Sequence, residues 1–349
     1  MKLAHIAILS SLTAFTLACS SPAPPPPEVA PAPEPPPPVV EAPVAPTPAE
    51  PTPEEKAQAE ARAKLEKDIR EMEQEARVEA QRWTPELHES AKPLAAATYP
   101  NVRAAFAKLS KSPHRVPGHA DRDQYRHPVE TLEFFGLKPN MTVLEYGPGE
   151  GWYTELLAPM LASKGLLIVT NTDPNGPATE RSTMYGRRFD MFKQKAPELY
   201  GKIQTVVIDA KQPSLGLTAS VDLALVIRGM HGWHQNGLVT TWLQQTYAAL
   251  KPGGVLGIVQ HRSAPGANPD ESTKKGYLPE EWVIQQVEAA GFKLSKKSEI
   301  NANAKDTKDY PEGVWSLPPT LREGDANRDK YLAIGESDRM TLRFIKPAS

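Results

Sequence analysis

The segment 143–154 reads VLEYGPGEGWYT and spaces its glycines as a ligand-binding turn would. Gly147, Gly149 and Gly151 alternate with other residues, and Glu145 stands two positions before the first of them. Glycines let a backbone turn tightly and approach a ligand without a Cβ in the way. This G-x-G-x-G spacing differs from the dinucleotide fingerprint, G-x-G-x-x-G. Because a carboxylate repels a pyrophosphate, Glu145 favours a cationic ligand such as an amino-acid ammonium or a sulfonium.

Two histidines in the segment RGMHGWH, His231 and His234, follow an apolar run at 223–227. A histidine titrates near neutral pH and can therefore accept a proton from a reacting group. We expect His231 to act as a general base, with His234 as the second candidate. The structural alternative is that His231 only hydrogen-bonds a loop.

Nearby aromatic and polar residues are candidates for substrate contacts. Tyr153 follows the glycine segment, and Trp233 lies between the two histidines. Aromatic walls of this kind favour a cationic or aromatic substrate. His261 and Arg262 follow another apolar run, where they either reach the same cleft or anchor a loop.

Two other groups of polar residues invite a metal hypothesis that their spacing does not support. His114, His119 and His127 have no compact ligand spacing. The segment 325–336, DANRDKYLAIGE, carries Lys330 where a calcium loop requires glycine. The sequence therefore predicts no metal site.

Alternating apolar and helix-compatible segments must position these residues, a pattern typical of a parallel α/β sheet. Strands are expected at 142–146, 166–170, 205–208, 223–227, 255–259, 292–300 and 340–345, and helices at 152–162, 238–250 and 280–290. Ligands of such sheets lie at the carboxyl ends of the strands, where the glycine segment and both histidines fall. The segment 301–339 is too long for a hairpin turn and predicts a lid or insertion.

On these motifs the sequence resembles the class I (Rossmann-like) S-adenosylmethionine-dependent methyltransferases. Glu145 and the glycines match that family's first motif, E/D-x-G-x-G-x-G, placed after a first strand. VVIDA (206–210) resembles its third-strand acidic motif, and LKPGGVLGIV (250–259) resembles its turn into the fifth strand. HPVETLEFFGLKP and MHGWH further resemble a group of bacterial methyltransferases with export signals. The resemblance implies a Rossmann-like methyltransferase fold, with a mostly parallel seven-stranded sheet and helices on both faces.

The resemblance also implies S-adenosylmethionine as the cofactor. Glu145 and the glycine segment would bind its positively charged, amino-acid-bearing part. Asn171 aligns with the acidic residue that holds the ribose hydroxyls in this family, and Asp173 stands two positions later. Asp209 fits the family position near the adenine amino group. Asn171 departs from the family's Asp or Glu, but an amide can still donate and accept hydrogen bonds.

The amino terminus predicts export to the bacterial cell envelope. Residues 1–18 combine a positive residue with an apolar run, as a signal peptide does. The segment TLAC (16–19) resembles a lipobox, which would make Cys19 the lipidated membrane anchor, and Ser20 points towards the outer membrane. Ordinary cleavage that leaves Cys19 as a free thiol is the alternative. Residues 19–53 hold nearly half of the 37 prolines, a composition that favours a disordered, extended linker.

The segment 54–90 begins with a stretch of high helix propensity at 54–83. Its apolar positions follow an approximate heptad spacing: Leu65, Ile69, Met72, Ala76 and Trp83. This spacing predicts an amphipathic helix. The helix either packs on the methyltransferase-like domain expected at 91–349, serves as a solvated spacer, or pairs weakly with a second copy as a short coiled coil.

Composition and motifs together narrow the function. The net charge of −2 argues against nucleic acid as the main partner, since neutralising phosphates needs a basic surface. We expect an S-adenosylmethionine-dependent methyltransferase acting on a small molecule. The alternatives are an envelope-tethered module that keeps the fold without catalysis, and a tethered interaction protein. Export favours these alternatives because S-adenosylmethionine is made in the cytoplasm, whereas the intact Glu145 and glycines favour the enzyme.

Overall fold

The computed structural model describes residues 52–209 and 213–348 of the chain. The predicted signal peptide, Cys19 and nearly all of the proline-rich segment lie outside the described residues. Thr52–Ser349 forms one compact unit. Among the described helices, none is long and apolar enough to cross a membrane.

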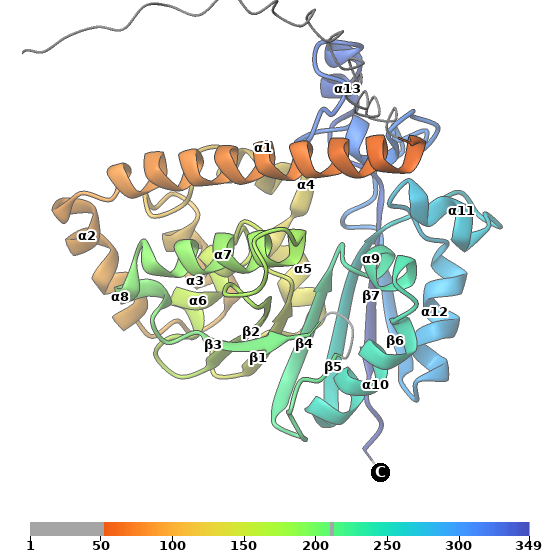
Figure 1. The fold of residues 1–349 in the computed structure, drawn as a ribbon. Helices are drawn as coiled ribbons and strands as arrows, with labels where there is room; N and C mark the ends of the chain where they lie inside the picture. Colours follow the sequence, from red (N-terminus) through yellow and green to blue (C-terminus); the bar gives the residue numbers. More distant parts are fainter. Residues whose placement is uncertain (1–51, 210–212, 349) are drawn as a thin grey trace, which may run out of the picture. The chain divides into compact units, whose positions relative to one another are not determined.

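A seven-stranded sheet forms the centre of this unit (Figure 1). The strands are β1 (Thr142–Tyr146), β2 (Leu166–Thr172), β3 (Gln204–Ile208), β4 (Val221–Ile227), β5 (Leu250–His261), β6 (Lys293–Ser298) and β7 (Arg339–Ile345). Their order in the sheet is β3-β2-β1-β4-β5-β7-β6, and β7 runs antiparallel to both of its neighbours. All the strands expected from the sequence are present, which confirms the mostly parallel, Rossmann-like sheet.

Helices precede, connect and follow these strands. The longer ones are α1 (Pro53–Arg82), α2 (Pro85–Ala96), α3 (Val102–Leu109), α5 (Pro128–Phe135), α6 (Thr154–Leu161), α7 (Arg181–Gln194), α10 (Val239–Ala249) and α12 (Glu280–Ala289). The shorter ones are η1 (Ala120–Arg122), α4 (Asp123–Arg126), α8 (Pro197–Tyr200), α9 (Met230–Gln235), α11 (Pro269–Lys274), η2 (Gly313–Ser316) and α13 (Arg328–Ile334).

The core has two layers because successive residues of a strand point to opposite faces of the sheet. Val143 packs in one hydrophobic cluster with Phe135 of α5 and Leu157 of α6. Its neighbour Leu144 packs in the other cluster with Trp242 of α10. Strands buried on both faces are expected to be mostly apolar, and β1, β2 and β4 are, with Glu145, Asn171 and Asp222 among the exceptions.

The topology creates a crevice at β1. This strand pairs with β2 on one side and with β4 on the other, both in parallel register. The chain therefore leaves β1 and β4 in opposite directions along the sheet, and space opens beyond the carboxyl end of β1. The glycine segment, which begins at Gly147, lies at this opening.

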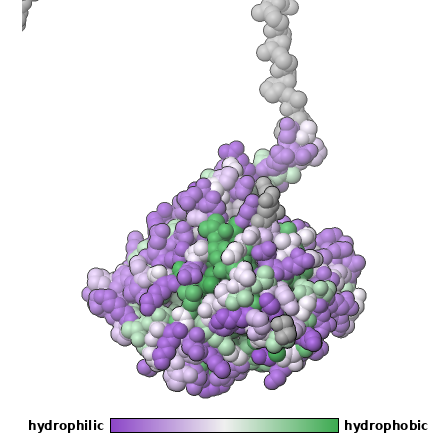
Figure 2. Space-filling model, turned by 90° about the horizontal axis from the view of Figure 1, so that it is seen from below, coloured by the Kyte–Doolittle hydropathy of each residue, from purple (hydrophilic) through white to green (hydrophobic). Residues whose placement is uncertain are grey.

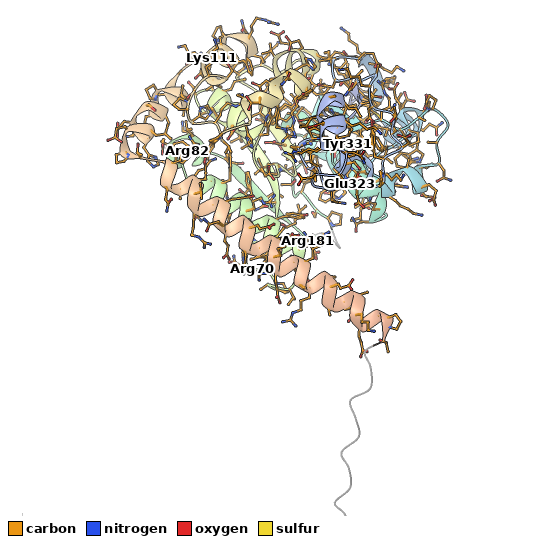
Figure 3. The ribbon with its side chains drawn as sticks, turned by 90° about the horizontal axis from the view of Figure 1, so that it is seen from above. Arg70, Arg82, Lys111, Arg181, Glu323 and Tyr331 are labelled. Atoms are coloured by element: carbon orange, nitrogen blue, oxygen red, sulfur yellow. The ribbon has the colours of Figure 1, made fainter. Side chains whose placement is uncertain are left out.

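Helix α1 packs on the domain through the seam that its sequence predicts. Leu65 and Met72 are buried together with Met184 of α7, and Ile69 packs against them. Arg181 of α7 pairs with an aspartate of α1, Asp68, at 2.6 Å. Figure 3 shows α1 from above, with Arg181 reaching it from α7. The apolar seam that a coiled-coil partner would need is thus occupied within the chain.

The region after α1 also belongs to the main core. Trp83, which ends α1, and Ala91 of α2 are buried in the same hydrophobic cluster as β1 and α6. The predicted helical segment 54–90 and the sheet therefore share one core.

Residues 301–339, here called the C-terminal insertion, separate β6 from β7 and form an ordered substructure. Tyr310, Leu317 and Tyr331 make a small hydrophobic cluster of their own. The hydroxyl of Tyr331 donates to Glu323 at 2.9 Å, and both residues are labelled in Figure 3. Helix α13 occupies most of the segment 325–336. Among the described residues, no group of three or more His, Cys, Asp or Glu side chains is arranged to hold a metal ion.

The β3 edge of the sheet is less covered than its centre. The described residues between β3 and β4, 209 and 213–220, contain no helix, and Val207 is 55% exposed. Figure 2 shows the molecule from below, where hydrophobic residues gather in one central patch of a largely hydrophilic face.

Candidate active site

A cavity of about 250 Å³ lies at the carboxyl ends of β1, β4 and β5. Tyr146 of β1, Ile227 of β4 and His261 of β5 line it. The C-terminal insertion contributes Trp315 to the same cavity, so the segment predicted as a lid forms one of its walls. The cavity stands where ligands of open α/β sheets are found.

The glycine turn forms another wall of the cavity and leaves room for a ligand. Gly147 and Gly149 line the cavity with φ angles of 53° and 60°, in the left-handed region that favours glycine. A Cβ at either position would meet no atom within 4 Å, so the backbone faces open space. Gly151 is different, because a Cβ there would stand 2.4 Å from the ring of Phe192. Gly151 therefore permits the close packing of α7 against the turn.

Glu145 is a buried carboxyl group at the cavity. Its side chain is 3% exposed and accepts a hydrogen bond from the hydroxyl of Thr154 at 2.8 Å. Burial raises the pKa of Glu145 to about 7, and the Thr154 hydrogen bond offsets only part of this rise. A cationic ligand group beside Glu145 would restore the charged form.

A cluster of arginines also contributes to the lining of the cavity. Arg122 and Arg126, from the segment before α5, line the cavity together with Glu336 of the C-terminal insertion. The carboxylate of Glu336 accepts from Arg122 Nε at 2.7 Å and from Arg339 Nη1 at 3.0 Å. Burial alone would raise the pKa of Glu336, but the surrounding guanidiniums hold it at about 2.

Arg228, the first residue after β4, also lines the cavity. It has a φ of 58°, an uncommon conformation for a residue with a side chain, and its backbone N–H donates to the carbonyl of Val259 at 2.6 Å. Backbone strain of this kind clusters at functional sites. Burial lowers the pKa of Arg228 to about 10, so the guanidinium remains charged at neutral pH.

The structure separates the histidines that the sequence grouped. His261 lines the cavity, and its Nδ1 lies 2.5 Å from the hydroxyl of Ser337. His231 lies behind it, with 6.0 Å between the two ring centroids, and its Nδ1 lies 3.4 Å from the amide nitrogen of Gln260. Burial lowers the pKa of His231 to about 4. Both rings are therefore neutral at physiological pH, since burial also lowers the pKa of His261.

His234 and Trp233 have partners elsewhere and are not part of the cavity lining. His234 Nε2 lies 2.8 Å from a carboxylate oxygen of Asp270, and its ring packs edge-on against Trp282. Trp233 stacks on Trp242 in the hydrophobic cluster under α10. Arg262, offered as a loop anchor, has that role, because it binds three carboxylates outside the cavity: Glu280, Glu299 and Asp338.

Tyr153 and Trp152 form the aromatic side of the cavity. Both are buried, and the Trp152 indole donates to the carbonyl of His119 at 2.8 Å. The guanidinium of Arg126 lies 4.6 Å from the centroid of the Trp152 ring, within the range of a cation–π contact. Tyr153 was expected from the sequence as a substrate contact and does line the cavity.

The residues expected to bind the nucleoside lie at the neighbouring ends of β2 and β3. The amide of Asn171 is buried and donates to the carbonyl of Gly186 in α7 at 3.1 Å. Asp173 is exposed and accepts from the backbone N–H of Asn175. Asp209 is exposed directly after β3. None of these three lines the cavity, so they would meet only a ligand that extends past the glycine turn.

Sequence reasoning missed most of the charged side chains in this site. Arg228 stands inside the motif RGMHGWH, but the histidines of that motif drew the catalytic assignment. Arg126 and Glu336 are 210 positions apart in sequence. A local signal existed only for Arg126, a charged residue beside the apolar run that becomes α5.

Comparisons with known proteins agree with this geometry. The model of a methyltransferase-domain family matches residues 119–296, just over half of the chain. A search of curated proteins found no match. An S-adenosylmethionine-dependent methyltransferase from Aquifex aeolicus is similar in structure, with 18% identity over 65% of this chain and 93% of that one, and a TM-score of 0.42.

Two further solved structures show the same kind of likeness. The N-methyltransferase NodS from Bradyrhizobium japonicum has 17% identity, covers 68% of this chain and 99% of its own, and has a TM-score of 0.41. The 1,6-didemethyltoxoflavin-N1-methyltransferase from Burkholderia thailandensis, solved with S-adenosylhomocysteine, has 16% identity, covers 64% and 78%, and has a TM-score of 0.38.

The family and the site give the same cofactor, S-adenosylmethionine. The open space beyond Gly147 and Gly149 and the buried carboxyl group of Glu145 suit its amino-acid part. The chain belongs to the methyltransferase-domain family, as a class I, Rossmann-like member that depends on S-adenosylmethionine.

Proposed function

We propose that the chain is an enzyme that methylates a small-molecule acceptor in the cavity beneath the C-terminal insertion. The observation that carries this proposal is the glycine turn, whose open face and buried Glu145 adjoin a cavity lined by aromatic and charged side chains. S-adenosylmethionine supplies a methyl group bonded to a positively charged sulfur. The chain's part is to hold the cofactor and the acceptor in line and to keep water out.

We assign the cofactor contacts as follows. Glu145 pairs with the ammonium group, and the backbone of Gly147 and Gly149 lies against the amino-acid part. Asn171, Asp173 and Asp209, at the ends of β2 and β3, are the residues nearest to the ribose and adenine. The side-chain nitrogen of Asn171 donates to the carbonyl of Gly186, so the side-chain oxygen of Asn171 makes the contact with ribose.

His261 is the residue we assign to the acceptor's proton. The acceptor's nucleophile forms a bond to the methyl carbon while the bond from that carbon to sulfur breaks, and the bonding pair stays on sulfur. A proton on the nucleophile then passes to a neutral imidazole. His261 is neutral, lines the cavity and has its Nδ1 held by Ser337, which leaves Nε2 for this task. His231, the base expected from the sequence, supports the His261 ring from behind.

The enzymatic proposal is tested by transfer of label from S-adenosylmethionine with a tritiated methyl group. The full chain is incubated with this cofactor and a small-molecule extract of bacterial envelope, and the products are separated from the cofactor. We expect labelled product from the wild type and at least a tenfold loss with Glu145→Gln. Cofactor binding without any transfer, across all extracts, would favour a non-catalytic module instead.

We also propose that the chain works in the bacterial envelope, with residues 1–18 as a signal peptide and Cys19 as a lipid anchor. Residues 19–53 would serve as the tether between the membrane, on the periplasmic side of the outer membrane, and residues 54–349. This proposal rests on the sequence of the amino terminus. Cys19→Ala should move the protein from the membrane fraction to the soluble fraction and abolish labelling by a radioactive fatty acid. Equal membrane recovery of the variant would contradict the anchor.

A further inference from the structure

The cavity contains more positive charge than the described residues balance. Arg122, Arg126 and Arg228 line it, and Arg339 shares the carboxylate of Glu336 with two of them. Glu336 is the carboxylate placed among them. Taking a guanidinium out of water is costly unless it is paired, so arginines that are wholly or partly buried favour a compensating anion.

Two of these guanidiniums, those of Arg122 and Arg126, are only partly hydrogen-bonded. Glu336 binds Arg122 and Arg339 through short contacts, and Arg126 only through Nε at 3.4 Å. Arg339 is satisfied, because its other nitrogens donate to backbone carbonyls. Among the described residues, the Nη2 atoms of Arg122 and Arg126 have no acceptor. Arg126 is only 3% exposed, and it is one of the residues that line the cavity.

Arg228 is the most isolated of the four. Its guanidinium forms no hydrogen bond or ion pair with any described residue, and its Nε is fully buried. Its backbone is held at a φ of 58°, which places this side chain at the cavity at a cost in free energy. A strained residue whose guanidinium has no partner among the described residues is poorly explained by stability of the fold.

The position of Arg228 relates it to the reaction. β1 and β4 are neighbours, with Tyr146 beside Val226, so Arg228 follows β4 at the level where the glycine turn follows β1. The other carboxyl groups nearby are already assigned. Glu145 belongs to the cofactor's ammonium group, and Glu150 pairs with Arg188 at 3.2 Å. With these carboxyl groups paired or assigned, negative charge for Arg228 would come from a bound ligand.

We infer that the methyl acceptor is a small molecule with a carboxylate or phosphate group, and that Arg228 and Arg126 bind this group. The inference rests on the proposed methyltransferase function and names its substrate class. Trp152, Tyr153 and Trp315 line the same cavity and would contact the apolar body of the acceptor. A guanidinium suits this role because it can form two parallel hydrogen bonds with a carboxylate or phosphate.

The carboxylate of the cofactor could also pair with these arginines. The following experiment distinguishes binding of the acceptor from binding of the cofactor. Inorganic phosphate and benzoate serve as probes and are titrated calorimetrically into the full chain, alone and saturated with S-adenosylhomocysteine. If the arginines bind the acceptor, at least one probe binds the saturated chain, and Arg228→Met weakens it at least tenfold. Affinity for S-adenosylhomocysteine should change less than threefold in the same variant.

Two further variants control for charge and folding. Arg103→Met removes one positive charge from a surface ion pair with Glu133 and should leave both affinities unchanged. Arg228→Lys should recover part of the probe affinity because it restores the charge. Without ligand, Arg228→Met should melt at the same temperature as the wild type or higher, since the guanidinium that it removes makes no hydrogen bond or ion pair with a described residue. A clear drop in its melting temperature would instead indicate a structural role and count against the inference.

Other outcomes overturn the inference directly. Competition between the probes and S-adenosylhomocysteine, with a tenfold loss of S-adenosylhomocysteine affinity in Arg228→Met, would assign the arginines to the cofactor. Absence of probe binding in every state of the wild type would remove the anion site altogether. If S-adenosylhomocysteine fails to bind but the probes bind through Arg228, the proposed function fails while the anion site stands.

Discussion

Glu145 offers a sharp test because its burial links stability, pH and cofactor binding. The carboxyl group is 3% exposed, and Thr154 is its hydrogen-bond partner. A rise of its pKa from 4.5 to about 7 corresponds to about 3 kcal/mol of free energy. Glu145→Gln keeps the size and the hydrogen-bonding oxygen but removes the titration.

The sign of the pH effect follows from the direction of the shift. Between pH 4.5 and 7 the folded chain holds a proton on Glu145 that the unfolded chain has released. The free energy of unfolding contributed by Glu145 therefore falls as pH rises through this window, and changes little above pH 7. Relative to Glu145→Gln, the wild type should lose about 3 kcal/mol between pH 4.5 and pH 8. In a thermal melt this is a relative change of roughly 5–10 °C.

Binding of the cofactor should offset the loss of stability that the charged form of Glu145 causes. An ammonium group beside Glu145 favours the carboxylate, so affinity for S-adenosylmethionine should weaken about tenfold for each pH unit below 7 in the wild type. Glu145→Gln should bind S-adenosylmethionine more weakly than the wild type at pH 8, and its affinity should not show this pH dependence. Melting curves with and without cofactor at pH 5, 6, 7 and 8 measure both effects. A wild type and variant that differ by a constant amount at every pH would refute the assignment of a buried, titrating carboxyl group.

The glycine turn and α1 yield further predictions. Gly151→Ala should lower the melting temperature by several degrees because its Cβ would stand 2.4 Å from Phe192. The Cβ of Gly147→Ala would enter open space, so this variant should lose only about 1 kcal/mol of stability. It should nevertheless bind S-adenosylmethionine at least tenfold more weakly in calorimetry. A larger loss of stability in Gly147→Ala and a larger loss of affinity in Gly151→Ala would contradict these two roles. Met72→Ala should destabilise the chain by about 2 kcal/mol in thermal melts, whereas Val78→Ala, at a 56% exposed position of the same helix, should be neutral. Equal effects at these two positions would mean that α1 does not pack through its apolar seam.

Local patterns made the sheet and the glycine turn predictable. Each apolar run marked one strand, and the sequence placed β1 at the residues where the structure has it, Thr142–Tyr146. The glycine spacing could be interpreted because backbone conformation is a local property. The heptad seam of α1 was likewise visible, but its partner was not, since nothing in 54–83 points to Met184 of α7.

The charged half of the site was not predictable because it forms only in three dimensions. Arg126, Arg228 and Glu336 come from three distant segments, and the order of the strands brings them together. The positions of the histidines were not predictable for a second reason, which is that the exact end of a strand decides which side chains reach the cavity. The sequence ended the fifth strand at 259, whereas β5 continues to His261 and places that ring in the cavity. His231, in the first turn of α9, consequently contacts Gln260 instead of the cavity. The sequence aligns Asn171 with the ribose ligand of the family, but gives no sign that its side-chain nitrogen also donates to the carbonyl of Gly186 in α7.

The central claim is that the cavity at the glycine turn binds S-adenosylmethionine. Calorimetric titration of the full chain with S-adenosylhomocysteine at pH 8, compared with Glu145→Gln, tests it most directly. We predict one site per chain in the wild type and at least tenfold weaker binding in the variant. No heat of binding at millimolar ligand, or equal affinity in the two proteins, would contradict the claim.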